Sequence, residues 1–347
     1  MPPVIEIPAH SSDPRLLVVA AEVLRRGGLV AFPTETVYGL GALAFDERAV
    51  HRIFVVKGRP HSHPLIAHVL DEARAMALAA EWPAVASRLI RAFWPGPLTV
   101  VVRRAPHVPA VVTGGGDSIA IRAPAHPVAR ALLTAVDGPV VAPSANRYQS
   151  LSPTTAFHVV RQLGETVDLV IDGGACETGI ESTVIDLRGR RPRVLRPGAL
   201  SLAQLRSIAP DLEVAPGLAA VDEDRASPGM DPRHYAPRAR LVLAQSSQAW
   251  SVARSLAVPP APVGLVLRYA RDDDGEHSAQ ASRAGDVLVR ILGDEPRAYA
   301  RVLYRTLYEL DDAGVTAIVV GRVPASEAWW AVADRLLRAT GSAPSRQ

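Results

Sequence analysis

Four polar residues in two short turns have the types and spacing that phosphate binding needs. Lys57 and Arg59 belong to the motif KGRP, and Ser144 and Asn146 belong to the motif PSAN. An ammonium group is a compact point charge that fits a phosphate oxygen in a tight pocket, and a guanidinium group is a planar fork that binds two oxygens at once. The neighbouring Gly, Pro and Ser residues let the backbone approach a ligand. Both motifs are therefore candidates for one binding site.

Lys57 and Asn146 are also unusual in the composition of the chain. The 347 residues include 38 lysines and arginines together, yet Lys57 is the only lysine and Asn146 the only asparagine. A chain that uses arginine almost everywhere keeps lysine where arginine fails, and this favours a functional role for the pair. The alternative is that KGRP is an ordinary solvated helix end, the commoner environment of a basic pair.

The elements around KGRP must position its two cations. Leu29–Phe32 is a short apolar run that stops at a proline, which is typical of a buried strand. Asp46 is a candidate cap for a helix whose apolar residues recur at helical spacing up to Lys57. Leu65–Val69 is typical of another strand. We expect the cations at the end of a helix, where backbone carbonyls attract positive charge and Gly58 frees the turn.

Predicted strands and helices alternate along the rest of the chain. Further strands are expected at Leu98–Val102, Ser118–Arg122, Pro139–Ala142, Val167–Ile171, Ser182–Leu187, Arg193–Leu195, Leu241–Leu243, Val263–Leu267, Val287–Ile291 and Ala317–Val320. Helices are expected at 14–26, Asp71–Ala80, Pro83–Phe93, Pro127–Val136, Thr154–Leu163, Arg297–Leu310 and Ser326–Arg338. This alternation indicates an α/β or α+β protein whose sheet is mixed rather than purely parallel.

The bulk composition sets limits on the class of protein. With 48% hydrophobic residues the chain is long enough for two domains, and its net charge of +3 and pI of about 9.3 permit a nucleotide or RNA partner without demonstrating one. Cys176 is the single cysteine, so an intramolecular disulfide and a cysteine-rich zinc site are excluded. No signal pattern and no apolar run of membrane-spanning length is present. We expect a cytoplasmic protein with no membrane partner.

Five motifs, in the same order along the chain, resemble the YrdC/Sua5 family, the threonylcarbamoyl-AMP synthases. They are PTETVYGLGA, KGRP followed by PLIAHV, PSAN, ESTVIDL and RPGAL. The resemblance covers about residues 10–208 for a catalytic domain, and the remainder of the chain resembles the two-domain Sua5 type. It implies a YrdC-like twisted mixed sheet with flanking helices, followed by a smaller Rossmann-like α/β domain.

The resemblance also implies a reaction. L-threonine, bicarbonate and ATP would give L-threonylcarbamoyl-AMP and pyrophosphate, with Mg²⁺ on the phosphates of ATP and no metal site built by the protein. Such a nucleotidyl transfer depends on positioning and charge stabilisation more than on a protein nucleophile. The product would serve the t6A37 modification of tRNA through a separate downstream threonylcarbamoyl transferase, and tRNA itself would be bound indirectly or weakly.

The family's functional positions can be carried over to matching residues of this chain. Lys57 and Arg59 would be catalytic. The residues expected to bind ATP are Lys57, Arg59, His63, Ser118, Ser144, Asn146, Ser152, Arg196 and Tyr235. Those expected to bind threonine are Thr36, His68, Arg122, Ala142 and Ser182, with Arg122 holding the amino-acid carboxylate in a two-point contact.

Several of these positions have an ordinary structural alternative. Arg196 can form a salt bridge, single serines such as Ser118 more often cap turns, and a lone strand histidine such as His68 is more often structural. Glu35 is a weak candidate for a base, because a glutamate in a turn is usually solvated. His63 stands where the family commonly has asparagine, and an imidazole replaces only part of an amide's hydrogen bonding.

The predicted domain boundaries follow from changes in composition. Residues 10–208 form the catalytic domain, 209–239 a linker or lid, and 240–342 the C-terminal α/β domain. The sequence SPGMDPRHYAP within the linker resembles a family segment that crosses the active-site mouth, whereas a passive tether is the alternative. The C-terminal part lacks a glycine-rich dinucleotide fingerprint, so nucleotide binding is not expected there.

Other classes of function remain open from the sequence. A non-catalytic RNA-binding or regulatory module of the same fold fits the basic balance, although no aromatic-studded basic strand is present. A carbamoyl-adenylate enzyme of the hydrogenase-maturation type would need cysteine zinc motifs that a chain with one cysteine does not supply. A plain α/β ligand-binding protein is the remaining alternative.

Overall fold

A computed structural model of the protein describes residues 1–11, 13–214, 234–269, 281–284 and 286–341. The chain divides into two compact units. The N-terminal unit comprises Met1–Tyr148 and Ser152–Met230, and the C-terminal unit comprises Gln149–Leu151 and Asp231–Gln347. Residues 215–233, the larger part of the linker predicted at 209–239, lie outside the described residues.

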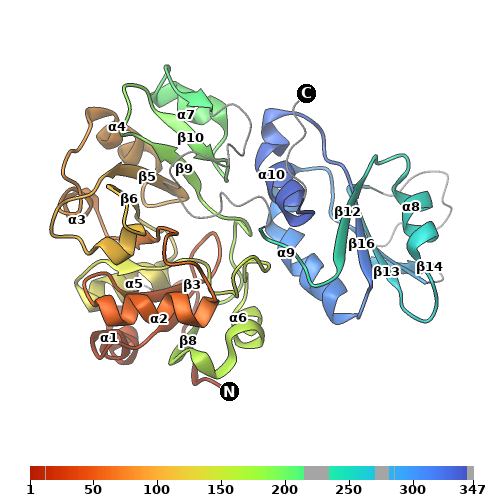
Figure 1. The fold of residues 1–347 in the computed structure, drawn as a ribbon, viewed down its shortest axis with the longest axis horizontal. Coiled ribbons are helices and arrows are strands. Elements are labelled where there is room, and N and C mark those ends of the chain that lie inside the picture. The colour runs from red at the N-terminus through yellow and green to blue at the C-terminus, as the bar shows by residue number, and fades with distance from the viewer. Residues whose placement is uncertain (12, 215–233, 270–280, 285, 342–347) are drawn as a thin grey trace. The chain divides into compact units, whose positions relative to one another are not determined.

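The N-terminal unit is organised around one mixed sheet (Figure 1). Its order is β1-β8-β2-β3-β7-β4-β6-β5-β9-β10-β11, and neighbouring strands run both parallel and antiparallel. The strands are β1 Val4–Glu6, β2 Val30–Phe32, β3 Gly39–Leu43, β4 Ile66–His68, β5 Leu98–Arg103, β6 Ser118–Arg122, β7 Val140–Val141, β8 Leu169–Asp172, β9 Thr183–Asp186, β10 Arg193–Arg196 and β11 Glu213–Val214. The expectation of a mixed sheet is confirmed.

Helices flank this sheet and supply its covering layers (Figure 1). They are α1 Val18–Arg25, α2 Glu47–Lys57, α3 Glu72–Met76, α4 Ala84–Phe93, α5 Pro127–Val136, α6 Ala156–Leu163 and α7 Leu202–Ile208, with short 3₁₀ turns at Pro14–Leu17, Ala110–Thr113 and Gly164–Thr166. The predicted helix at Asp71–Ala80 is shorter in the structure, since α3 ends at Met76.

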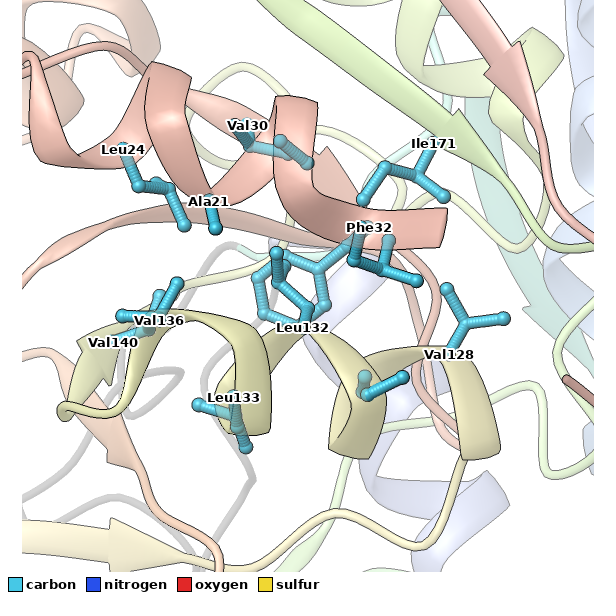
Figure 2. Packing of buried hydrophobic residues seen from close by; sticks show 14 of the residues in the cluster. Ala21, Leu24, Val30, Phe32, Val128, Leu132, Leu133, Val136, Val140 and Ile171 are labelled. Atoms are coloured by element: carbon cyan, nitrogen blue, oxygen red, sulfur yellow. The ribbon is translucent and has the colours of Figure 1, made fainter. Parts of the chain in front are cut away.

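The main core of this unit lies between one face of the sheet and helices α1 and α5. Figure 2 shows Leu24 of α1 and Leu132 of α5 in the same cluster as Val30 and Phe32 of β2. All four side chains are fully buried. Full burial of each such side chain contributes about 1.5–3 kcal/mol. This packing fixes β2, and therefore the start of the turn that follows it.

Helix α2 ends as the sequence predicts. The Asp46 carboxylate accepts a hydrogen bond from the Ala49 amide at 3.1 Å and caps the start of the helix. Gly58 ends the helix in the left-handed conformation, with φ of 63°. Lys57 is therefore the last helical residue, and Arg59 begins the turn that leads to β4.

Strand β3 was not expected from the sequence. Its residues Gly39–Leu43 include two glycines, a residue type that is depleted in strands. The structure gives the glycines a packing role: a Cβ on Gly41 would lie 2.8 Å from Phe32 Cε1 and 3.0 Å from Val140 Cγ1. Only glycine lets β3 pass between those two core side chains.

The C-terminal unit is a smaller α/β structure (Figure 1). Its sheet has the order β12-β16-β13-β15-β14, parallel except for the antiparallel β14. The strands are β12 Arg240–Ala244, β13 Val263–Leu267, β14 Ala281–Ala284, β15 Val287–Ile291 and β16 Ala317–Gly321, and the helices are α8 Ala249–Leu256, α9 Pro296–Asp312 and α10 Trp330–Ala339. Within the described part of the chain, no helix is both long and apolar enough to cross a membrane.

Candidate active site

A row of polar side chains crosses three adjacent strands of the large sheet. His68 of β4 pairs with Arg122 of β6, and Arg122 pairs with Thr99 of β5. Residues paired in this way point to the same face of a sheet. The row continues to Ser182, just before β9, because its hydroxyl lies 2.7 Å from the Thr99 hydroxyl. All four side chains are buried, so this is an enclosed polar strip.

The turn after β2 reaches this row by crossing the face of the sheet. Arg122 donates from Nη1 to the Thr36 hydroxyl at 2.8 Å, and its Nη2 lies 2.6 Å from Glu35 Oε1. Strands β2 and β6 are four strand spacings apart, about 19 Å in a flat sheet. Contact at hydrogen-bond distance therefore requires the turn to fold back over the sheet, where it brings Thr36 beside Arg122.

The structure corrects the expectation for Glu35. Its side chain is buried and ion-paired with Arg122, whereas a turn glutamate was expected to be solvated. Arg122 Nε also donates to the Gly96 carbonyl at 3.2 Å. The Glu35 carboxylate thus occupies one side of the guanidinium fork that was predicted to hold the carboxylate of threonine.

His68 is held as a neutral ring. Burial, and then the charge of Arg122, lower the pKa of His68 from 6.5 to about 3. Its Nδ1 is buried and makes no hydrogen bond within the described part of the chain. A buried polar atom left without a partner is costly, so Nδ1 is well suited to a polar group of a ligand.

Lys57 organises the PSAN turn. Its Nζ donates to the backbone carbonyls of Ser144 and Asn146, each at 2.5 Å, and the Tyr148 amide donates to the Lys57 carbonyl at 2.8 Å. Burial, followed by the charge of Arg59, holds the pKa of Lys57 well below its usual value. The sequence placed Lys57, Ser144 and Asn146 in one site, and the structure brings them together through carbonyl groups that the sequence did not indicate.

The PSAN turn also pairs with the residues that start β3. The Leu40 amide donates to the Pro143 carbonyl, and the Ala145 amide donates to the Tyr38 carbonyl, both at 2.8 Å. Ala142, predicted to contact threonine, is part of the apolar core, and its amide donates to Ile66 O at 2.9 Å. Two motifs far apart in sequence therefore form one backbone scaffold.

Arg59 and His63 lie in the turn between α2 and β4. Arg59 is buried and donates to the Pro64 carbonyl at 3.0 Å. The ring of His63 is also buried and packs edge-on against the ring of Tyr148, with centroids 5.5 Å apart. The turn that holds both residues thus contacts the segment that follows PSAN.

A second group of hydrogen bonds surrounds the ESTVIDL motif. Arg196 donates from Nη2 to the Ser182 hydroxyl at 3.1 Å and to the Ser182 carbonyl at 3.0 Å. Ser152 donates to the Glu181 carboxylate. A Cβ on Gly198 would lie 2.3 Å from the Thr183 amide nitrogen, so only glycine allows RPGAL to lie against this backbone. These hydrogen bonds hold Arg196 against Ser182.

Ser118 lies at the far end of β6. It is four residues before Arg122 on the same strand, which corresponds to about 13 Å. The strip between them is apolar and includes Ile66, Val101 and Ala120. Ser118 and Arg122 therefore lie at opposite ends of one face, with hydrophobic side chains between.

Tyr235 belongs to the C-terminal unit. Its ring is buried and stacks on Tyr304, with centroids 6.1 Å apart, and the Arg335 guanidinium lies over it at 4.9 Å. Its predicted contact with ATP remains a prediction.

Thr99 and Glu181 were not identified from the sequence. Thr99 bonds to Ser182, and Glu181 accepts from Ser152. Thr99 could have been recognised only from the register that pairs it with Arg122, and a single sequence does not reveal that register. In the described part of the chain, no group of three or more His, Cys, Asp or Glu residues is arranged to hold a metal ion.

An enclosed polar row on a mixed sheet, with a lysine-organised turn beside the same strands, is typical of an α/β protein that binds a small polar ligand. A family model described as "Telomere recombination" matches residues 22–198, and one described as "Threonylcarbamoyl-AMP synthase, C-terminal domain" matches residues 200–341.

Curated relatives and solved structures agree with these matches. The threonylcarbamoyl-AMP synthase of Pyrococcus abyssi is 40% identical over 93% of this chain and 93% of its own length, and that of Bacillus subtilis is 34% identical over 95% and 94%. The crystal structure of P. abyssi Sua5 complexed with L-threonine matches with a TM-score of 0.86, at 37% identity and 97% coverage of each chain. The chain belongs to the Sua5/YrdC family of threonylcarbamoyl-AMP synthases, in its two-domain form, and is an enzyme.

Proposed function

We propose that this enzyme is a nucleotidyltransferase that makes L-threonylcarbamoyl-AMP from L-threonine, bicarbonate and ATP and releases pyrophosphate. The observation that carries the proposal is the enclosed row His68–Arg122–Thr99–Ser182, which offers a cation, an uncharged ring and hydroxyls within one strip. The names of the relatives, and the L-threonine complex of P. abyssi Sua5, support threonine as the amino acid.

The row suits an amino acid with a small polar side chain. Arg122 supplies the positive charge for the carboxylate, with Glu35 exchanging its place on the guanidinium for the substrate. The Thr36 hydroxyl bonds to Arg122 and the Ser182 hydroxyl bonds to Thr99, and both suit the hydroxyl and amine of threonine. The neutral His68 ring accepts a hydrogen bond without adding a second positive charge beside Arg122.

The chemistry joins the amino acid to the nucleotide in two steps. The threonine amine attacks the carbon of bicarbonate and water leaves, which gives a carbamate. A carbamate oxygen then attacks the α-phosphorus of ATP, and the bond to the β-phosphate oxygen breaks as pyrophosphate departs. Mg²⁺ enters with ATP as part of the substrate and offsets charge on the leaving phosphates.

The nucleotide is assigned to the residues around KGRP and PSAN. Lys57 shapes the PSAN turn, so that Ser144 and Asn146 present their polar groups beside the two cations. Arg196, Ser152 and Ser118 complete the proposed nucleotide set. Ser118 and Arg122 are separated by about 13 Å on one face, which matches separate binding of the nucleotide and the amino acid.

The product is proposed to leave for a separate transferase that modifies tRNA, so the enzyme itself needs only weak or indirect contact with tRNA. An RNA-binding module without catalysis is the alternative. A measurement of substrate turnover distinguishes the enzyme from this module.

The direct test is incorporation of labelled carbon. The full chain is incubated with ¹³C-bicarbonate, L-threonine and Mg-ATP, and nucleotide products are analysed by mass spectrometry. A labelled AMP conjugate that forms only when threonine is present is the expected result. Absence of any labelled conjugate, together with salt-sensitive RNA binding, would establish the alternative.

A further inference from the structure

Three residues of the N-terminal part of the chain are built into the C-terminal unit. Gln149–Leu151, here called the strap, is grouped with residues 231–347, although the residues on both sides of it belong to the N-terminal unit. The strap lies between Asn146 and Ser152, two residues of the proposed nucleotide site. Consecutive Cα atoms are 3.8 Å apart, so the position of Leu151 limits where Ser152 can lie.

The backbone of the strap is held by Ala236 and by Tyr308. The Ala236 amide donates to the Gln149 carbonyl at 2.9 Å, and Ser150 and Ala236 form a parallel β-bridge. The Tyr308 hydroxyl donates to the Leu151 carbonyl at 2.7 Å. Both Leu151 and Tyr308 are buried, so this bond is shielded from water.

The contact is made at the cost of backbone strain. Gln149 and Tyr235 have φ of 66° and 59°, in the left-handed region that residues other than glycine seldom adopt. Within the described part of the chain only Asp137 shares this property, so two of the three such residues adjoin the same β-bridge. Strain of this kind persists where the surroundings hold it, and it is concentrated at functional positions.

The C-terminal unit supplies those surroundings. Tyr235 is fixed between Tyr304, at 6.1 Å between centroids, and the Arg335 guanidinium, at 4.9 Å from the ring centroid. Arg335 is itself fully buried and paired with Asp334 at 2.5 Å. The bridge partner of the strap is therefore a rigid one.

The residues flanking the strap are also anchored. On one side, Lys57 binds the Asn146 carbonyl and accepts from the Tyr148 amide. On the other side, Ser152 donates to Glu181. The strap is thus the one stretch between these two anchors whose position is set by the C-terminal unit.

We propose that Tyr308 is a positioning residue of the nucleotide site. Through its bond to the Leu151 carbonyl, α9 sets the path of the strap and so the placement of Asn146 and Ser152 for ATP. This inference rests on the assignment of ATP to that loop, and it gives the C-terminal unit a role in nucleotide affinity without a ligand of its own.

The matched test compares two buried tyrosines of α9. Tyr308→Phe removes the hydroxyl that binds the strap, whereas Tyr299→Phe removes a buried hydroxyl that has no hydrogen-bond partner in the described part of the chain. We expect Tyr308→Phe to raise the KM for ATP about five- to tenfold, the effect of one hydrogen bond. The KM for threonine should change less than twofold, and Tyr299→Phe should resemble the wild type.

Equilibrium titration with ATP, in the absence of threonine, accompanies the kinetics. An unchanged ATP affinity and KM in Tyr308→Phe would overturn the proposal, as would equal losses for ATP and threonine or equal effects in Tyr299→Phe. A wild type that binds ATP but releases no pyrophosphate with threonine would refute the proposed reaction alone, and the titrations would still decide the role of Tyr308.

Discussion

The residues of the polar row gain their properties from burial. Arg122 lies in the interior with Glu35 as its counter-ion, and removal of one partner from such a pair leaves a costly unpaired charge. The family resemblance indicated Arg122 and His68 as site residues, and His68 also lies within the motif PLIAHV. The sequence did not indicate the Glu35 pair, because the contact depends on a turn that crosses four strand spacings.

The depressed pKa of His68 predicts a pH dependence of stability. The unfolded chain takes up a proton at His68 as pH falls through 6.5, whereas the folded protein keeps the ring neutral down to about pH 3. The stability from this group is therefore complete above pH 6.5 and is lost as pH falls towards 3, by about 1.4 kcal/mol per pH unit.

Urea unfolding at pH 7 and pH 5 measures this effect. The wild type should lose about 2 kcal/mol more than His68→Gln between the two pH values, since only the wild type carries the titrating ring. Equal losses in both proteins would show that His68 is not held neutral by the fold.

Elements with strong local signals could be predicted from the sequence. Helix α2 was identified from the capping Asp46, its apolar spacing and Gly58, and the structure confirms all three. Strand β3 was missed, since Gly39 and Gly41 are needed for packing against side chains remote in the sequence. The strap was missed for a related reason: its bonds to Ala236 and Tyr308 connect residues 87 and 157 positions apart.

The backbone of RPGAL lies so close to that of ESTVIDL that a methyl group added at Gly198 should change the KM for threonine strongly. In Gly198→Ala the new Cβ would lie 2.3 Å from the Thr183 amide and would displace Ser182 from Thr99. We expect the KM for threonine to rise at least tenfold, because Ser182 is part of the proposed threonine site.

Gly189→Ala is the matched control for that substitution. Gly189 lies in the turn between β9 and β10, and a Cβ there would meet no atom closer than 3.7 Å. Its threonine KM should stay within twofold of the wild type. Similar kinetics in both variants would contradict the placement of Ser182 at the threonine site.

At the scale of the whole molecule, the two units differ in which of the predicted site residues they contain. The N-terminal unit carries the polar row, KGRP, PSAN and ESTVIDL, whereas the C-terminal unit carries Tyr235 and the bonds to the strap. The C-terminal sheet is nearly all parallel, as expected for a Rossmann-like unit, and its sequence has no glycine-rich fingerprint. Positioning of the nucleotide loop is the function that we propose for this unit.

Release of pyrophosphate tests the central claim most directly. The full chain is assayed with Mg-ATP while L-threonine and bicarbonate are omitted in turn, for the wild type and for Lys57→Arg. We predict release that requires both substrates and falls at least a hundredfold in the variant. The reason is that a planar guanidinium does not fit the buried site where Lys57 Nζ binds two carbonyls at 2.5 Å.

Release that proceeds without threonine or bicarbonate would contradict the proposed synthesis. Full activity in Lys57→Arg would leave the reaction standing and would contradict the role of the single lysine as organiser of the nucleotide turn.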